Sequence, residues 1–378
     1  MKIGIDCRLW NETGIGRYIR NLIINLIELD GKNEYVLFMQ NEDRPKLKVN
    51  SEKLKVVGVD IKWHTLEEQL RFPQILNREN LDLMHFPYFS VPVFYNRPFV
   101  VTIHDLILNH FPTGQASTLP GPIYNIKLLA YKFILNQEAK KAKKIIAVSN
   151  ATKNEIIDHL KINPQKITVT YEGADDKISN FPTSSRSAGL RGASKILNTK
   201  YFLYVGNAYP HKNLDRLLKA FSDLRQNDTK LVLIGKEDYF YKRLKNKAQS
   251  LRLSDKVIFL QNVSDKELSN LYQNALALIM PSLMEGFGLP ALEAMANNCL
   301  VLASNIPSLK EVCGDAALYF NPLSINELAD KLSMIAIHNT EYKELEEIRK
   351  RGIERARKFS WQKMARETLK VYESCVGL

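Results

Sequence analysis

The chain has 378 residues, of which 45% are hydrophobic and 25% are charged, and this composition excludes a disordered, collagenous or disulfide-scaffold protein. Its length predicts two domains rather than one, each large enough to bury its own core. With 53 Lys and Arg against 41 Asp and Glu, the net charge of +12 favours anionic partners: nucleic acid, phosphorylated small molecules or an acidic membrane surface.

The start of the chain and its cysteines predict a cytoplasmic protein. Met1 is followed by an alternating run at residues 2–6, where a secretory signal would place basic residues and then a long apolar segment. No apolar stretch in the sequence approaches the roughly 20 residues that cross a bilayer. The four cysteines are far apart and form no C-x-x-C pair, which predicts reduced, mostly buried thiols instead of a metal cluster or a redox pair.

In chain order, short apolar runs alternate with amphipathic segments, which is typical of a parallel sheet covered by helices on both faces. An early helix is predicted by Ile19, Leu22, Ile23, Leu26 and Ile27, which recur at helical spacing. The strands predicted in the first half are residues 2–6, 35–39, 54–60, 81–86, 99–104, 144–149 and 167–171.

A second series of strands follows residues 179–194, a stretch rich in Ser, Gly, Pro and Arg that is typical of a domain boundary. We therefore expect an α/β protein of two doubly wound domains with a cleft between them, and ligands beyond the carboxyl ends of the strands. Residues 359–376 are predicted to form a last helix. The predicted strands of the second series are residues 201–206, 231–235, 257–260, 277–281, 300–304 and 317–320.

Glycine-rich or polar segments follow several strands of the first half. Gly14-Ile15-Gly16 directly precedes the early helix, where glycines and the positive helix end suit a phosphate, although an ordinary strand-to-helix turn explains them equally well. His104 and Asp105 end a later strand, and they either contact a substrate or cap the following turn. Ser149 is predicted to cap the next helix, with Glu155 near the position of a reciprocal cap.

The second half carries two more specific segments. Its first strand leads into Gly206-Asn207 and then Lys212 at a helix entrance, where the lysine charge and the helix amides suit a diphosphate; an exposed lysine beside a loop is the alternative. A later strand leads into Glu285 and a glycine loop, and Pro290 opens a helix that carries Glu293. Two carboxylates suit vicinal sugar hydroxyls, and the glycines allow backbone amides to face a phosphate.

With these residues the chain resembles family 4 of the retaining glycosyltransferases, which have the GT-B fold. The resemblance covers nearly the whole chain. It rests on E-G-F-G-L-P-A-L-E-A from Glu285 to Ala294, on Gly206 with Lys212, and on Gly14-Ile15-Gly16. The segments around Asp6-x-Arg8 and Thr102-Ile103-His104-Asp105-Leu106 are most similar to bacterial mannosyltransferases that build O-antigen and related polysaccharides.

The resemblance implies a domain division and residue roles. Residues 1–180 would form an acceptor-side Rossmann-like domain, residues 181–359 the nucleotide-sugar domain facing it across a cleft, and residues 360–378 a helix packed back on the first. Three residues would be catalytic: His104 against the donor sugar, Lys212 at the leaving diphosphate and Glu285 on sugar hydroxyls. Lys212 and Glu285 would also bind the donor, together with Gly14, Ile15, Gly16, Gly206, Asn207, Gly235, Lys236, Asn262, Val263, Gly286, Phe287, Gly288, Leu289 and, on the ribose, Glu293.

One position departs from the family pattern, because Asn207 stands where members commonly carry Arg. Lys212 would then bear the phosphate charge, with His211 or Arg17 as candidates for a second cation. Neither glycine loop holds a D-x-D metal pair, so we expect a reaction without metal or cofactor, in which fixed positive charge stabilises the departing phosphate. Retention without a protein nucleophile implies same-face displacement, in which the leaving phosphate helps to remove the acceptor proton.

The resemblance favours mannose from GDP-mannose as the donor and a lipid-linked or oligosaccharide acceptor, in cell-surface polysaccharide synthesis. A UDP-sugar transferase or a sugar-nucleotide epimerase of the same fold stays open. Basic residues are widely distributed and show no zinc or RNA-recognition signature, which argues against nucleic acid.

Apolar residues within 124–135 precede Lys140, Lys141, Lys143 and Lys144. They predict either a surface for anionic lipid on the inner face of the cell membrane, or a core-facing helix with a solvated basic end.

Overall fold

The computed structural model describes residues 1–47, 49, 51–111, 121–174, 199–224, 228–338 and 343–376. The chain divides into two compact units. Unit 1 comprises Met1–Gly173 and Ser360–Leu378, and unit 2 comprises Ala174–Phe359. The expected domain boundary at residues 180 and 181, with the Ser- and Gly-rich stretch around it, lies outside the described residues.

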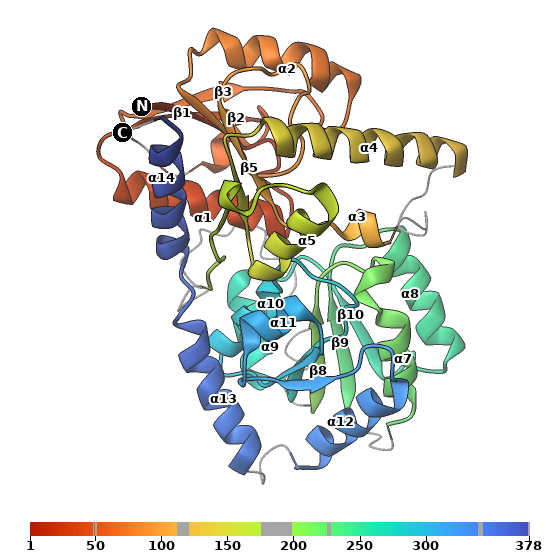
Figure 1. Ribbon diagram of the computed structural model, residues 1–378. Coiled ribbons are helices and arrows are strands. Elements are labelled where there is room, and N and C mark those ends of the chain that lie inside the picture. The colour runs from red at the N-terminus through yellow and green to blue at the C-terminus, as the bar shows by residue number, and fades with distance from the viewer. Residues whose placement is uncertain are drawn as a thin grey trace. The chain divides into compact units, whose positions relative to one another are not determined.

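Unit 1 is built on a seven-stranded parallel sheet in the order β3-β2-β1-β4-β5-β6-β7 (Figure 1). Its strands are β1 Lys2–Asp6, β2 Glu34–Met39, β3 Leu54–Gly58, β4 Leu83–Phe86, β5 Phe99–Ile103, β6 Lys144–Ala147 and β7 Ile167–Val169. Its helices are α1 Gly14–Leu29, α2 Leu66–Arg78, α3 Ile107–His110, α4 Gly121–Lys141, α5 Asn150–Leu160 and α14 Trp361–Val376, with short 3-10 turns η1 Arg44–Lys46 and η2 Pro164–Lys166.

The first and last helices of unit 1 lie side by side. The predicted apolar face of α1 is buried, with Ile19, Leu22, Ile23 and Leu26 at most 1% exposed. Helix α14, dark blue in Figure 1, packs along α1, shown in red, so the last segment of the chain completes the fold of its first half.

Unit 2 is built on a six-stranded parallel sheet in the order β10-β9-β8-β11-β12-β13. Its strands are β8 Tyr201–Val205, β9 Lys230–Ile234, β10 Val257–Leu260, β11 Ala277–Met280, β12 Val301–Ser304 and β13 Leu318–Phe320. Its helices are α7 Leu214–Ser222, α8 Tyr239–Ser250, α9 Asp265–Asn274, α10 Leu289–Ala296, α11 Pro307–Cys313, α12 Ile325–His338 and α13 Lys343–Ala356, and the 3-10 turn η4 spans Pro210–Lys212.

In both sheets the strand order reverses once, between β1 and β4 in unit 1 and between β8 and β11 in unit 2. Such a reversal sends the two neighbouring connections to opposite faces of the sheet, so their loops diverge and leave room for a ligand at the carboxyl ends of the strands. The loops that follow β8 and β11 carry Lys212 and Glu285.

Each predicted strand is present, and several end one or two residues earlier than expected, because the connecting loop or the next helix begins there. The strand expected to reach residue 149 ends at Ala147, since the Ser149 hydroxyl accepts a hydrogen bond from the Thr152 amide at 3.0 Å and caps α5. The reciprocal cap expected from Glu155 is wrong. Its carboxylate contacts His110 and His159 instead.

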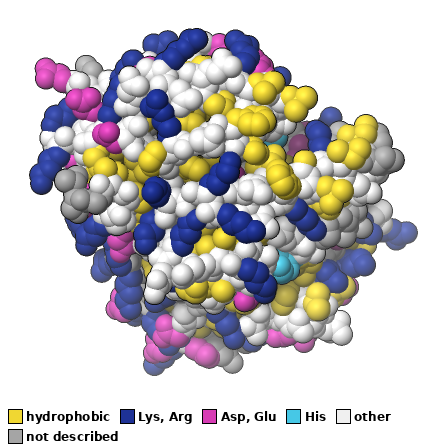
Figure 2. All heavy atoms as spheres, turned by 45° about the horizontal axis from the view of Figure 1, so that its top comes forward, with side chains coloured by type: hydrophobic (Ala, Val, Ile, Leu, Met, Phe, Trp, Pro, Cys, Tyr) yellow, Lys and Arg dark blue, Asp and Glu magenta, His cyan; other side chains and the backbone are white. Residues whose placement is uncertain are grey.

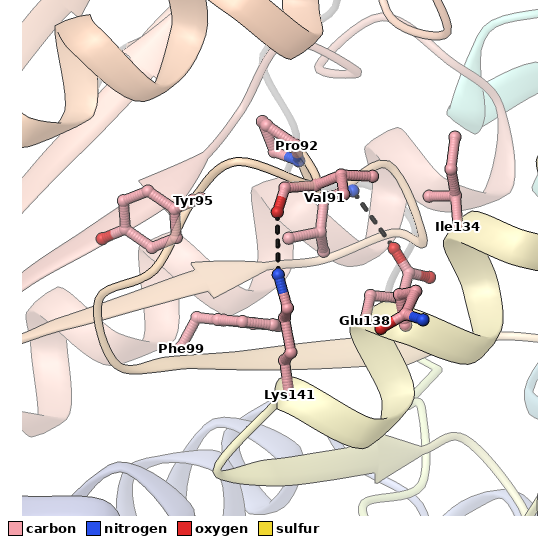
Figure 3. Close-up of a pocket in the computed structure, with 9 residues that line it drawn as sticks. Val91, Pro92, Tyr95, Phe99, Ile134, Glu138 and Lys141 are labelled. Atoms are coloured by element: carbon pink, nitrogen blue, oxygen red, sulfur yellow. Dashed lines mark hydrogen bonds between the residues drawn. The ribbon is translucent and has the colours of Figure 1, made fainter.

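Helix α4 is anchored to unit 1 by its carboxyl-terminal half. The Glu138 carboxylate accepts the Val91 amide at 3.2 Å (Figure 3). Lys141 Nζ donates to the Val93 carbonyl at 2.9 Å. A small, mainly apolar pocket lies between α4 and the loop that carries Val91 and Val93. None of the residues predicted to bind the sugar donor lines it. Among the described helices, none has both the length and the apolarity to cross a bilayer.

Candidate active site

Two loops at the sheet reversal of unit 2 are bonded to each other. The Leu283 amide donates to the His211 carbonyl at 2.8 Å. Asn213 has a left-handed backbone with φ of 61°, and its side-chain amide donates to the carbonyls of Pro281 and Pro322, each at 2.9 Å. These bonds fix the β8 loop against the β11 loop, and the sequence offered no signal for this role of Asn213.

Lys212 and Glu285 meet as a consequence of this bonding. Lys212 Nζ lies 2.8 Å from both carboxylate oxygens of Glu285, and the Ser282 hydroxyl donates to the same carboxylate at 2.6 Å. The two side chains are 17% and 9% exposed. Burial alone would raise the pKa of Glu285, but the Lys212 charge and the hydrogen bonds from Lys212 and Ser282 outweigh it and hold this pKa below its usual value. The site therefore holds a paired ammonium and carboxylate.

His211 does not supply the second cation that the missing family arginine leaves open. Burial, together with the neighbouring Lys212 charge, lowers the pKa of the His211 side chain to about 4. The ring is therefore neutral at pH 7. Asn207 forms hydrogen bonds with residues next to it in the chain, in and beside the loop after β8. Its carbonyl accepts the Tyr204 hydroxyl at 2.6 Å, and its side-chain oxygen accepts the Tyr209 amide at 3.4 Å.

The glycines around this loop allow close backbone contacts. Gly206 has φ of 150°, and its carbonyl accepts the Tyr241 hydroxyl at 2.7 Å. A Cβ on Gly235 would lie 2.3 Å from the Gly206 carbonyl oxygen. Gly288 precedes α10 with φ of 95°, where an added Cβ would lie 2.5 Å from Leu309. These three positions therefore accept only glycine without rearrangement.

The other predicted donor residues of unit 2 occupy the same edge of the sheet. Gly235-Lys236 follow β9 and Asn262-Val263 follow β10, so the loops after β10, β9, β8 and β11 line up in the order of the strands. Lys236 and Asn262 are exposed.

Buried side chains surround the glycine loop that precedes α10. The Phe287 ring is 4% exposed and packs edge-on against Phe359, with 5.9 Å between centroids. The Glu293 carboxylate on α10 is also buried, and it accepts the Tyr272 hydroxyl at 3.0 Å. Gly286 and Leu289 are buried next to them.

In unit 1, His104 follows β5 and is 9% exposed. Its Nε2 lies 3.0 Å from the Pro87 carbonyl and its Nδ1 lies 3.2 Å from the Glu172 carboxylate. Because a carbonyl can only accept, Nε2 carries a proton in this arrangement. Both ring nitrogens therefore contact protein groups, and Glu172 is a partner that the sequence pattern did not indicate.

The two glycines at the start of α1 have different surroundings. An added Cβ on Gly14 would meet no described atom within 4 Å, whereas on Gly16 it would lie 2.5 Å from the Trp10 carbonyl oxygen. Gly14 is exposed and Ile15 is half-buried. Gly16 is therefore explained by packing, and Gly14 stays a candidate for ligand contact.

A chain of buried polar groups links His104 to α14. The Tyr18 ring packs edge-on against His104 at 4.9 Å, and its hydroxyl lies 3.2 Å from the Thr102 hydroxyl. Thr102 lies 2.8 Å from Nε2 of His85, whose Nδ1 lies 2.6 Å from the Tyr372 hydroxyl on α14. Burial, with the nearby His104, lowers the pKa of His85 to about 3, so this ring is neutral and bonds as one donor and one acceptor.

We expect Tyr372→Phe to lower the free energy of unfolding by about 1–3 kcal/mol, because it leaves a buried His85 nitrogen without its partner. Tyr95→Phe is the matched control. Tyr95 is also buried in unit 1, but its hydroxyl has no hydrogen-bond partner among the described residues, so its removal should cost nothing. Urea unfolding of both variants measures the difference. Equal stability of the two variants would contradict a bonded role for Tyr372.

A second buried polar group lies at the end of β1. The Arg8 guanidinium donates to Asp6 at 2.7 Å and to Glu68 of α2 at 2.6 Å, and it stacks on the Phe72 ring at 3.9 Å. Burial raises the pKa of Glu68, and the Arg8 charge opposes this effect. Asp6-x-Arg8 thus holds the first strand end to α2, a structural role within unit 1.

Two family models match the chain and leave little of it uncovered. Glycosyltransferase Family 4 matches residues 13–177, and Glycosyl transferases group 1 matches residues 190–359. The chain belongs to the family 4 glycosyltransferases. The two matched ranges fall on unit 1 and unit 2, so the family assignment applies to both sheets of this glycosyltransferase.

Several relatives with curated names are mannosyltransferases. The glycosyltransferase is 30% identical to O-antigen chain mannosyltransferase RfbU of Salmonella typhimurium, over 69% of this chain and 66% of the relative. It is 28% identical to O-antigen chain mannosyltransferase B of Escherichia coli, over 77% of this chain and 74% of the relative. A third, MMP alpha-(1->4)-mannosyltransferase of Mycolicibacterium hassiacum, is 30% identical over 65% of this chain, and the match spans 58% of that relative's length.

Solved structures confirm the GT-B fold predicted from the sequence. Sucrose-phosphate synthase from Thermosynechococcus elongatus aligns with a TM-score of 0.80 at 19% identity, over 99% of this chain and 98% of that chain. WaaG, a glycosyltransferase involved in lipopolysaccharide biosynthesis, aligns with a TM-score of 0.74 at 16% identity, over the whole of both chains. Anabaena HepE in complex with UDP-glucose aligns with a TM-score of 0.76 at 18% identity, over 99% of this chain and 100% of that chain.

Proposed function

We propose that this glycosyltransferase moves a hexose, with retention of configuration, from a nucleoside diphosphate donor bound by unit 2 to a lipid-linked or saccharide acceptor in cell-surface polysaccharide synthesis. The observation that carries the proposal is the Lys212–Glu285 pair, which lies between the two loops at the sheet reversal. Such a reversal is where doubly wound sheets bind nucleotides.

In this proposal the two charges have separate tasks. The Lys212 ammonium neutralises the diphosphate as the bond to the sugar breaks, when negative charge on the leaving oxygen increases. The Glu285 carboxylate accepts hydrogen bonds from sugar hydroxyls and keeps Lys212 in position. Gly206, Gly288 and the amino-terminal end of α10 let the backbone approach the phosphates, and the Glu293 carboxylate binds the ribose.

The chemical step we propose is same-face displacement. The bond between the anomeric carbon and the diphosphate oxygen breaks, the acceptor oxygen bonds to the same face of that carbon, and the leaving phosphate takes the acceptor proton. Lys212 and the α10 amides supply the positive charge, so the step uses no metal ion or cofactor. The donor roles expected of His104 and of Gly14, Ile15 and Gly16 stay predictions.

GDP-mannose is the preferred donor in this proposal, because the three relatives described above are named mannosyltransferases. A UDP-hexose is the second candidate, favoured by the likeness to HepE, which was solved with UDP-glucose. A shift in thermal stability with each donor separates the two, since a ligand that binds the folded state raises the unfolding temperature.

The experiment that tests the proposal incubates the glycosyltransferase with GDP-mannose in excess EDTA, with and without a bacterial membrane lipid extract as acceptor. We expect GDP and an α-mannosylated lipid to form in equal amounts, and only in the presence of the extract. A β-linked product would overturn the retaining mechanism. Conversion of the sugar without an acceptor would indicate an epimerase, and loss of transfer in EDTA would overturn metal independence.

We also propose that α4 docks on an anionic membrane surface. One stripe of the helix is apolar and exposed: Ile123, Ile126, Leu129 and Phe133 are 48–69% exposed. The exposed Lys127 and Lys132 flank this stripe, and Lys140 and Lys141 follow at its carboxyl-terminal end. In Figure 2, where the side of unit 1 that carries α2 and α4 comes forward, hydrophobic side chains lie next to basic ones. This combination suits lipid headgroups and the acyl boundary below them.

The core-facing alternative accounts for part of α4 only, since Leu135 and Ala139 are buried while the stripe is not. We expect Leu129→Asp with Phe133→Asp, and separately Lys127→Glu with Lys140→Glu, to abolish flotation with phosphatidylglycerol vesicles and to leave the unfolding temperature unchanged. Leu323→Asp is the control, because Leu323 is 64% exposed in unit 2. Unchanged flotation of both double variants would discard the proposal.

A further inference from the structure

Two histidines and one glutamate converge between α3 and α5 of unit 1. Glu155 and His159 lie one helical turn apart on α5, and His110 is the last residue of α3. Nε2 of His159 lies 3.2 Å from a Glu155 carboxylate oxygen, and Nε2 of His110 contacts the same oxygen. The two imidazole rings meet edge to face at 4.7 Å. The function proposed above uses none of these residues.

The Glu155 carboxylate pairs with histidine side chains although lysine and arginine are far more common in this chain. The chain holds 53 Lys and Arg but 7 His, and the ion partners of the Glu155 carboxylate are two of these histidines. All three side chains are between 31% and 39% exposed, so an ion in solution can reach them. Two imidazole nitrogens and one carboxylate oxygen form a His₂Glu ligand set, which binds zinc with three protein ligands and one open position.

We propose that His110, Glu155 and His159 form a site for a zinc ion. Their ligand atoms lie within 4.8 Å of one another. Two ligands of a tetrahedral zinc ion with bonds of 2.0–2.1 Å are about 3.3 Å apart, so side-chain rotation is enough to arrange the three around one ion. Imidazole favours zinc and similar transition metals, whereas calcium and magnesium prefer oxygen ligands alone.

A zinc ion at this site would tie α3 to α5 directly after the segment that carries His104. One hydrogen bond already joins α5 to this preceding segment, since the Thr152 hydroxyl of α5 donates to the His104 carbonyl at 3.1 Å. The three ligands are separate from the residues that we assign to the donor, so zinc binding is independent of the transfer reaction. A chain without transfer activity would still bind the ion, and an active chain that binds no zinc would leave the proposed function intact.

The test uses the full chain without a polyhistidine tag, treated with EDTA and then dialysed. A Cys375→Ser background removes the half-exposed thiol as a competing ligand. We expect one Zn²⁺ per chain by calorimetric titration at micromolar concentration, visible absorption bands with Co²⁺, a higher unfolding temperature with Zn²⁺, and no binding of Mg²⁺ or Ca²⁺ in this range.

Variants assign the ligands. Each of the substitutions Glu155→Gln, His110→Gln and His159→Gln removes one ligand and is expected to weaken Zn²⁺ binding by roughly 100-fold or more. This loss is larger than the loss expected for a residue that only forms a hydrogen bond to a ligand. Asp158→Asn is the matched control, because Asp158 is an exposed neighbour on α5 and the change removes the same charge as Glu155→Gln. Absence of Zn²⁺ binding in the Cys375→Ser chain, or equal affinity in the three ligand variants and the control, would overturn the proposal.

Discussion

Glu285→Gln is expected to reduce transfer about 100- to 1,000-fold while the protein stays folded, which is the effect of losing one preorganised electrostatic contact to a transition state. The amide oxygen of glutamine can still accept the Ser282 hydroxyl, which lies 2.6 Å from the carboxylate. The negative charge is lost, however, so Lys212 is no longer fixed and sugar hydroxyls meet a weaker acceptor. Steady-state kinetics with donor and acceptor measure the loss, and circular dichroism checks the fold.

Glu346→Gln is the control for this substitution. Glu346 pairs with Lys350 at 3.2 Å on α13, and both side chains are about two-thirds exposed. An exposed pair of this kind contributes little to stability and none to the site. If Glu285→Gln and Glu346→Gln retained the same rate, the assignment of Glu285 would be wrong.

Lys212→Met is expected to abolish measurable transfer and to weaken donor binding, because it removes the positive charge that we assign to the diphosphate. It also leaves the Glu285 carboxylate buried without its cation. We expect a loss of about 3 kcal/mol in the free energy of unfolding at pH 7, at the lower end for a broken buried pair because Lys212 is 17% exposed.

The pH dependence of this loss follows from the Glu285 pKa. In the native chain this pKa is depressed, so the ionised carboxylate contributes stability above its unfolded pKa of about 4.3, and this contribution is lost as the pH falls through the folded pKa. Without Lys212, burial raises the pKa instead, and stability is then lost as the pH rises through it. The deficit of Lys212→Met should therefore be larger at pH 7 than at pH 4.

Urea unfolding at pH 4 and pH 7 measures this difference, and Lys350→Met serves as the control because its partner Glu346 is exposed. A deficit of Lys212→Met that did not change with pH would mean that Glu285 does not depend on Lys212 for its charge. Full transfer by Lys212→Met would exclude Lys212 from the site.

The sequence predicted the two parallel sheets well because buried strands leave a local signal. Apolar runs such as residues 277–281 identify β11, and the polar and glycine residues after them identify the edge where Lys212 and Glu285 meet. The predicted positions of the strand ends were less accurate, because a residue such as Ser149 fits both the end of a strand pattern and the cap of the next helix.

Contacts between distant segments could not be predicted, because no spacing rule relates their residues. Tyr372 bonds His85 across 287 positions of the chain, and Asn213 bonds Pro281 across 68. The same reason explains Glu155, whose spacing to Ser149 suggested a cap while its actual partner His110 lies on another helix. His211 shows a further limit, since its ring is neutral because of its burial and the nearby Lys212 charge, and the burial is known only from the folded chain.

Calorimetric titration of GDP-mannose and UDP-glucose into the native chain, Glu285→Gln and Lys212→Met tests the central claim most directly, because it needs no knowledge of the acceptor. We predict that one of these donors binds the native chain at micromolar concentration and binds Lys212→Met at least about tenfold more weakly, which corresponds to about 1.4 kcal/mol. The affinity of Glu285→Gln for this donor should lie between the affinities of the native chain and of Lys212→Met. Equal affinity in all three proteins, or no binding of either donor to the native chain, would contradict a donor site at the Lys212–Glu285 pair.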